Sequence, residues 1–118
     1  MIYLATPYTH PDRAVRLARF RAVNKAASLL MQKGHHVFSP ISHSHPIAEE
    51  GGLPTSWEFW EKYDIEVLKM CSQVIVLMLE GWKESKGVAA ELEIAKSLGI
   101  GITFAEPDAL FGFTIPKN

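Results

Sequence analysis

The chain has 118 residues, 47% of them hydrophobic and 21% charged, and a formal net charge of -1 at pH 7. This length and composition predict one globular domain, residues 1–118, with no room for a second. The near-neutral charge, without a Lys/Arg cluster, argues against binding to polymeric nucleic acid.

The chain opens with a strand-like run, followed by a long helical pattern. The apolar run Ile2–Ala5, ended by Thr6-Pro7, predicts a short buried strand. From Asp12 or Arg13 to Lys33, apolar residues recur at helical spacing, and the next residue, a glycine, is well placed to end the helix.

The middle of the chain predicts a second short strand and then a loop. The strand covers residues 36–38 and ends at Ser39-Pro40. Residues 41–55 contain two glycines, two prolines and several hydroxyl groups, which favours a long loop with at most one helical turn. Loops of this length in compact domains are often functional.

The second half alternates helices and strands. We predict a helix from Ser56 to about Met70, a buried strand over residues 73–79, a helix from Ser85 to Leu98 and a last strand near residues 101–104. The tail, residues 105–118, is interrupted by prolines and gives no clear pattern.

This order predicts a three-layer α/β domain, flavodoxin-like or Rossmann-like, with a mostly parallel sheet of four or five strands. Ligands of such folds bind beyond the carboxyl ends of the strands. The candidate residues at that edge are Thr6, Tyr8, His10, Ser39, Ser42, His43, Trp82, Ser85, Gly87 and Glu91.

Glu91 has two interpretations. It flanks the apolar stripe of its helix one turn from the start, where a carboxylate is either solvated or held at the mouth of a site. Its position after the most apolar strand of the chain puts it at the predicted ligand edge and favours the site.

The start of the same helix, Ser85 to Val88, offers free backbone N–H groups to an anion such as a phosphate. A simple N-cap explains the pattern about equally well. Neither a Walker loop nor a dinucleotide-binding glycine motif is present.

A second carboxylate, Asp64, lies in the preceding helix, where solvent exposure is the commoner fate of such a residue. Facing Glu91 across a cleft, it would complete the nucleophile-and-acid pair that cleaves glycosidic bonds. His43 and His45 form a weak metal pattern without a cysteine or a spaced carboxylate motif, so we expect no metal site. Cys71 is interpreted as a packing residue.

Together these segments resemble the nucleoside 2-deoxyribosyltransferase superfamily, most closely its small DUF1937-like branch with a YLA-[ST]-PY-[ST] signature. The resemblance covers most of the chain. It is carried by IYLATPYTH, by HVFSPISH, by the acidic helix around Asp64 and by SKGVAAELEIA. The last stretch matches the family's G-x-x-x-E-L-G-x-A pattern, with Glu91 at the position of the nucleophile.

The resemblance implies a role for each matching residue. Glu91 would attack the anomeric carbon of a deoxyribosyl group and form a covalent glycosyl-enzyme. Tyr3 would orient Glu91, and Asp64 would handle the leaving base. Ser85 stands where base-exchanging members carry an acidic residue, which resembles the branch that hydrolyses deoxynucleoside 5′-monophosphates. Glu93 replaces the usual glycine of the motif.

The expected function is therefore cleavage or transfer at the N-glycosidic bond of a nucleoside or, preferably, a 5′-nucleotide. Ser85 and Gly87 would hold phosphate or sugar, and Thr6, Tyr8 and His43 are further candidate contacts. No cofactor or metal is implied. The alternative is a nucleotide-binding module that uses the same cleft without turnover.

Two expectations concern the setting of the protein. The family assembles as dimers or larger oligomers, so we expect a homo-oligomer with the Trp-rich helix at its interface. The single cysteine and the lack of an 18-residue apolar run or a basic leader predict a soluble, cytoplasmic protein without a membrane segment.

Overall fold

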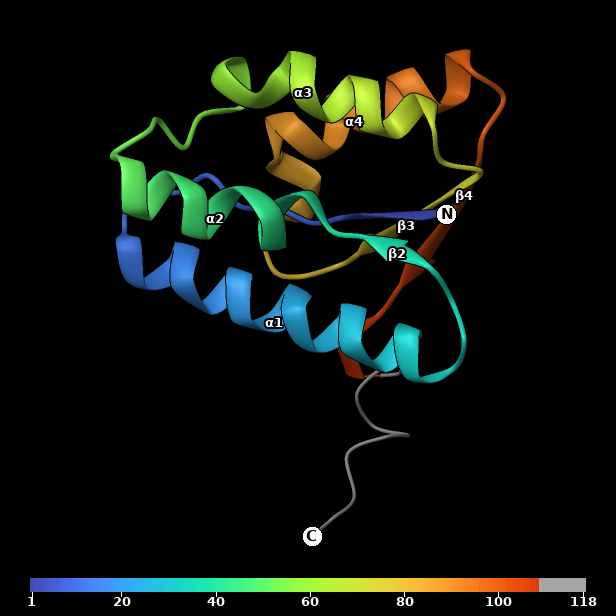
Figure 1. Ribbon diagram of the computed structural model, residues 1–118, viewed down its shortest axis with the longest axis horizontal. Coiled ribbons are helices and arrows are strands. Elements are labelled where there is room, and N and C mark those ends of the chain that lie inside the picture. Colours follow the sequence, from blue (N-terminus) through green and yellow to red (C-terminus); the bar gives the residue numbers. More distant parts are fainter. Residues whose placement is uncertain (109–118) are drawn as a thin grey trace, which may run out of the picture.

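The computed structural model describes residues 1–108 and contains one four-stranded sheet (Figure 1). Its strands are β1 (Ile2–Ala5), β2 (Val37–Phe38), β3 (Gln73–Leu77) and β4 (Gly101–Ala105). All neighbouring strands are parallel, in the order β2-β1-β3-β4. This arrangement confirms the predicted three-layer α/β fold and follows the first four positions of the flavodoxin-like order.

Helices cover both faces of the sheet. They are α1 (Arg13–Gln32), α2 (Pro40–Gly51), α3 (Trp57–Lys69) and α4 (Lys86–Ser97), with a short 3-10 turn at Trp82–Glu84. In Figure 1, α3 and α4 lie on one side of the sheet, and α1 and α2 lie on the other. Along residues 1–108, no helix is long and apolar enough to cross a membrane.

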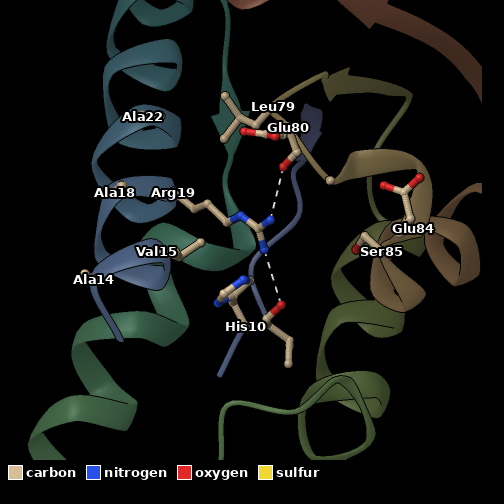
Figure 2. A pocket seen from close by; sticks show the side chains of 12 residues that line it. His10, Ala14, Val15, Ala18, Arg19, Ala22, Leu79, Glu80, Glu84 and Ser85 are labelled. Carbon is tan, nitrogen blue, oxygen red and sulfur yellow. Dashed lines mark hydrogen bonds between the residues drawn. The ribbon is translucent and has the colours of Figure 1, made fainter. Parts of the chain in front are cut away.

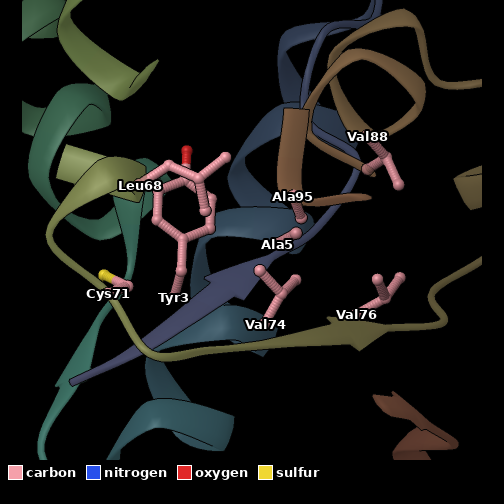
Figure 3. Packing of buried hydrophobic residues seen from close by; sticks show 8 residues of the cluster. All are labelled: Tyr3, Ala5, Leu68, Cys71, Val74, Val76, Val88 and Ala95. Atoms are coloured by element: carbon pink, nitrogen blue, oxygen red, sulfur yellow. The ribbon is translucent and has the colours of Figure 1, made fainter. Parts of the chain in front are cut away.

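Two apolar clusters hold these layers together. On the α1 face, Leu4 and Leu77 of the sheet pack against Val23 and Leu30 of α1. On the opposite face, strand residues pack against α3 and α4; the cluster comprises Tyr3, Ala5, Leu68, Cys71, Val74, Val76, Val88 and Ala95 (Figure 3). Cys71 is buried in this cluster, as its interpretation as a packing residue requires. The central strands β1 and β3 are thus largely buried, as expected inside a parallel sheet, whereas β2 is half-buried and β4 is half-buried to exposed.

The predicted loop over residues 41–55 is wrong, because most of it is the helix α2. Ser39 caps this helix by accepting a hydrogen bond from the backbone N–H of Ser42, and Pro40 occupies the first turn, where no N–H is needed. Pro46 lies inside the helix, and Gly52, with a φ of 65°, ends it. Ser39-Pro40 was therefore a helix start as well as a strand end.

The chain reverses its winding between β1 and β3. These strands are direct neighbours, but α1 after β1 packs on one face and α4 after β3 packs on the other. Such a switch point leaves a crevice at the carboxyl ends of the two strands. The loop after β1 and the start of α4 meet there.

Candidate active site

A cavity of about 270 Å³ lies at this switch point. Its walls come from the loop after β1, from α2, from the segment that enters α3 and from the start of α4. Six of the residues predicted from the sequence line it: Thr6, Tyr8, Asp64, Ser85, Gly87 and Glu91. Tyr3 lies behind the cavity and contacts it through Glu91.

Tyr3 and Glu91 are joined by a short, buried hydrogen bond. The Tyr3 side chain is fully buried, and in Figure 3 its hydroxyl points away from β1 toward the helices. It donates to Oε2 of Glu91 at 2.5 Å. One oxygen of the carboxyl group is thereby fixed, and Oε1 has no hydrogen-bond partner among residues 1–108.

The environment of Glu91 favours the protonated carboxyl group. Only 5% of Glu91 is exposed. Burial raises its pKa to about 8; the Tyr3 hydrogen bond lowers the pKa, and the nearby charge of Asp64 raises it. The burial of Tyr3 and the adjacent carboxylates also raise the pKa of its phenol, so that it remains a hydrogen-bond donor.

Asp64 is the second buried carboxyl group at the cavity. It lies on α3, is 6% exposed and has no hydrogen bond to any residue of the described chain. Desolvation raises its pKa to about 7. Two carboxyl groups that both titrate near neutral pH can exchange a proton with a ligand bound between them.

The start of α4 forms another wall. Ser85 caps the helix by accepting from the backbone N–H of Val88 at 3.2 Å. Lys86 forms an exposed ion pair with Glu58 of α3. A Cβ atom on Gly87 would stand 3.4 Å from the Trp57 indole, so the missing side chain makes room for this ring. Trp57 itself lines the cavity.

A buried hydroxyl group of the cavity wall also lacks a hydrogen-bond partner. Thr6 is 5% exposed, and its Oγ1 is buried without a hydrogen bond. Buried hydroxyl groups are normally satisfied, because leaving one unpaired costs about 1–3 kcal/mol. Thr6 lines the same cavity as both carboxyl groups. A bound molecule with a polar group would satisfy it.

The structure separates the two histidines of α2. His43 does not line the cavity; its ring stacks on Tyr63 with centroids 5.1 Å apart. His45 is 4% exposed, and its Nδ1 lies 2.5 Å from the Tyr8 hydroxyl. Sequence reasoning weighed His45 only as a metal ligand. Its spacing from Ile41 and Ala48 would have placed it on a buried helix face, had α2 been predicted.

Arg19 joins two loops at the edge of the site, and sequence reasoning missed it. Its guanidinium donates to the carbonyl oxygens of Tyr8 and Thr9 at 3.3 and 3.2 Å, and to that of Glu80 at 3.1 Å. Figure 2 shows it reaching from α1 between these segments, within an open groove of about 810 Å³. No sequence motif marks an arginine whose partners are backbone carbonyls.

No group of three or more His, Cys, Asp or Glu side chains within residues 1–108 could hold a metal ion.

Comparison with known proteins places this geometry in context. A family model described as a domain of unknown function, DUF1937, matches residues 1–106. The fold is similar to a solved 2-deoxyribosyltransferase from the psychrotolerant bacterium Bacillus psychrosaccharolyticus, with 28% sequence identity and a TM-score of 0.60. That match covers 90% of this chain and 72% of the other. A search of curated proteins gives no significant match.

Proposed function

The chain belongs to the DUF1937 domain family, and from its buried carboxyl pair and its fold we propose that it cleaves or transfers an N-glycosidic bond. The substrate would be a nucleoside, preferably a deoxynucleoside, or its 5′-nucleotide. The observation that carries the proposal is the Tyr3–Glu91 hydrogen bond behind a cavity that both Glu91 and Asp64 line. The fold shared with a 2-deoxyribosyltransferase supports it.

In the first step, ionised Glu91 attacks the anomeric carbon C1′ through the oxygen that Tyr3 leaves free. The C1′–O bond forms as the C1′–N bond to the base breaks, and the electron pair of that bond passes to the base. Asp64, whose pKa of about 7 leaves a large protonated fraction near neutral pH, gives its proton to the departing base.

In the second step, water or a second base attacks C1′ and releases Glu91. The Asp64 carboxylate takes the proton of the incoming nucleophile, which restores both groups to their starting states. Water as the nucleophile makes the protein a hydrolase, and a base makes it a transferase. Tyr3 keeps Glu91 oriented in both steps.

Substrate contacts would come from three parts of the wall. The unpartnered hydroxyl of Thr6 would bind a polar group of the sugar or base, and the ring of Tyr8 would form a neighbouring surface. Ser85 and Gly87 would receive the 5′ end of the substrate at the start of α4.

The charges near α4 bear on the phosphate state of the substrate. Lys86 is engaged by Glu58, and Glu84 also lines the cavity. A 5′-phosphate at the helix start would have to compete with Glu58 for Lys86 and approach Glu84. The helix N-terminus and the Ser85 hydroxyl favour a phosphate, whereas these two carboxylates favour an uncharged nucleoside.

The test is release of free base, followed by chromatography, from a panel of deoxynucleosides, ribonucleosides and their 5′-monophosphates, with and without an acceptor base. We expect release by the wild type, and a loss of at least about 1000-fold in Glu91→Ala, because no other group replaces the nucleophile. Glu93→Ala is the matched control, since Glu93 is exposed on the same helix.

The results of this panel separate the alternatives. A requirement for the acceptor base indicates a transferase, and release without it indicates a hydrolase. If nucleosides raise the melting temperature equally in wild type and Glu91→Gln but no base is released, the protein is a nucleotide-binding module. Equal release by wild type and Glu91→Ala would refute the role of Glu91.

A further inference from the structure

Tyr8 and His45 form a buried pair directly behind the cavity wall. Tyr8 is 6% exposed and lines the cavity, whereas His45 does not line it. The two side chains meet at a Tyr8 Oη to His45 Nδ1 distance of 2.5 Å. Tyr8 follows β1 and His45 belongs to α2, so the pair links two separate segments of the site.

His45 is itself held in place by aromatic rings. Its imidazole stacks on Phe20 of α1 with centroids 4.2 Å apart and an interplanar angle of 25°. The Tyr8 ring lies edge-on to the imidazole at 5.6 Å and 85°. A stacked, buried imidazole has little rotational freedom, so its Nδ1 is a fixed point for the Tyr8 hydroxyl.

The protonation states of the pair and the tautomer of the imidazole together determine the direction of the hydrogen bond. Burial lowers the pKa of His45, and Arg13 and Arg16 lower it further, although Glu49 raises it; the ring is therefore neutral near pH 7. Burial raises the pKa of the Tyr8 hydroxyl, which stays a phenol, against the opposing effect of Arg16. With the proton of the neutral imidazole on Nε2, Nδ1 accepts and Tyr8 donates its hydrogen away from the cavity; with the proton on Nδ1, the direction is reversed.

We propose that His45 carries its proton on Nε2 and is a positioning residue of the substrate site: its Nδ1 accepts from the Tyr8 hydroxyl and fixes the Tyr8 ring as a rigid wall that offers the substrate no hydrogen-bond donor. This proposal rests on the proposed nucleoside function of the cavity. Because Glu91, Tyr3 and Asp64 do not contact this pair by any hydrogen bond, the pair acts on substrate binding and leaves the chemical step unchanged.

The test is a double-mutant cycle on KM and kcat. Tyr8→Phe keeps the ring and removes the hydroxyl, and His45→Phe keeps an aromatic ring against Phe20 and removes Nδ1. We expect each variant to raise KM by roughly five- to tenfold, as loss of one buried hydrogen bond does, with kcat within about twofold of wild type. The KM of the double variant should be no higher than that of the single variant with the higher KM, because both substitutions remove the same hydrogen bond.

A second measurement reports the hydrogen bond without turnover. The ¹⁵N spectrum of labelled protein should show His45 Nδ1 as an unprotonated acceptor whose signal shifts in Tyr8→Phe, with His45→Phe used to assign it. Any one of four results would overturn the proposal. Nδ1 could be protonated, or KM could be unchanged in both single variants. The increases in KM could multiply in the double variant, or kcat could fall as much as KM rises.

Failure of this inference can be told apart from failure of the proposed function. If the wild type releases base but the Tyr8 and His45 variants keep its KM, only the positioning role is refuted. If the wild type releases no base, the proposed function is refuted, and the same cycle is then read from the dissociation constant of a deoxynucleoside by calorimetry. If the deoxynucleoside does not bind, the positioning role is refuted as well.

Discussion

Glu91 couples the candidate chemistry to stability. Its pKa is raised from 4.5 to about 8, so the folded chain holds this proton more tightly than the unfolded chain does. Protonated Glu91 therefore contributes to the free energy of unfolding fully below about pH 4.5, and this contribution is lost progressively as the pH rises to about 8. Glu91→Gln, which still accepts a hydrogen bond from Tyr3, removes the effect.

We expect the stability of Glu91→Gln relative to wild type to increase by on the order of a few kcal/mol between pH 5 and pH 9. Urea denaturation at the two pH values measures this difference. Glu93→Gln serves as the control, because Glu93 is an exposed residue of the same helix. A parallel pH dependence in wild type and Glu91→Gln would mean that Glu91 is not buried as described.

The proposed mechanism also fixes the pH dependence of activity. It needs Glu91 ionised and Asp64 protonated, although their pKa values are about 8 and about 7. Only a minor fraction of the protein has this arrangement at any pH. The plot of kcat/KM against pH should be bell-shaped, and the apparent pKa values of its two limbs belong to the coupled pair of carboxyl groups. Asp64→Asn should lower kcat by roughly 10²- to 10⁴-fold and abolish the fall at high pH. An unchanged alkaline limb in that variant would exclude Asp64 as the acid.

Single residues were predictable where they end a strand or fit a helical pattern. The rule that ligands bind beyond strand ends put Thr6, Tyr8 and Glu91 in one place, and the structure brings these three together. His45 and Arg19 were not predictable, because their roles depend on contacts between α1, α2 and the loop after β1. His43 belongs to the same helix as His45 but faces Tyr63, away from the cavity.

Among the elements, all seven that the sequence predicts outside residues 41–55 agree with the structure to within about two residues. They are α1, α3, α4, β1, β2, β3 and β4. The helix α2 was missed because its glycines and prolines resemble those of a loop. Pro40 and Gly52 in fact mark its two ends, and Pro46 is tolerated inside it. Composition alone cannot distinguish helix-ending residues from loop residues when the helix is only 12 residues long.

The turn between β3 and α4 depends on a glycine. Gly81 has a φ of +92°, and a Cβ there would lie 2.6 Å from Nη2 of Arg19. Gly81→Ala should therefore destabilise the fold by about 1–2 kcal/mol, through backbone strain and displacement of Arg19 from the Glu80 carbonyl. Chemical denaturation measures the loss. Gly101→Ala is the control, since a Cβ there meets no atom within 4 Å. Equal stability of the two variants would contradict the described turn.

On the scale of the whole molecule, the sequence order of strands and helices was sufficient to predict the parallel sheet and the edge that carries the site. It could not give the order β2-β1-β3-β4, which creates the switch point between β1 and β3. Residues 109–118 of the predicted tail lie outside the described part of the chain. The cavity forms where α1 and α4 leave for opposite faces, so its shape is a property of the complete arrangement.

The surface of α3 bears on assembly. Phe59 and Tyr63 are 48% and 46% exposed, and Trp60 packs between their rings at centroid distances of 5.3 and 6.3 Å. We propose that this aromatic surface is the interface of a homo-oligomer. Sedimentation should show a dimer or larger species in wild type and a shift toward monomer in Phe59→Glu/Tyr63→Glu. A wild type that remains monomeric at high concentration would contradict the proposal.

The central claim is that Glu91 forms a covalent bond to the sugar, and the stereochemistry of transfer tests it most directly. With methanol as the acceptor, proton NMR of the first methyl deoxyriboside formed from a β-deoxynucleoside identifies its anomer before any equilibration. Two displacements through Glu91 predict retention, so the product should be the β-anomer. The α-anomer, formed by a single displacement, would contradict the account.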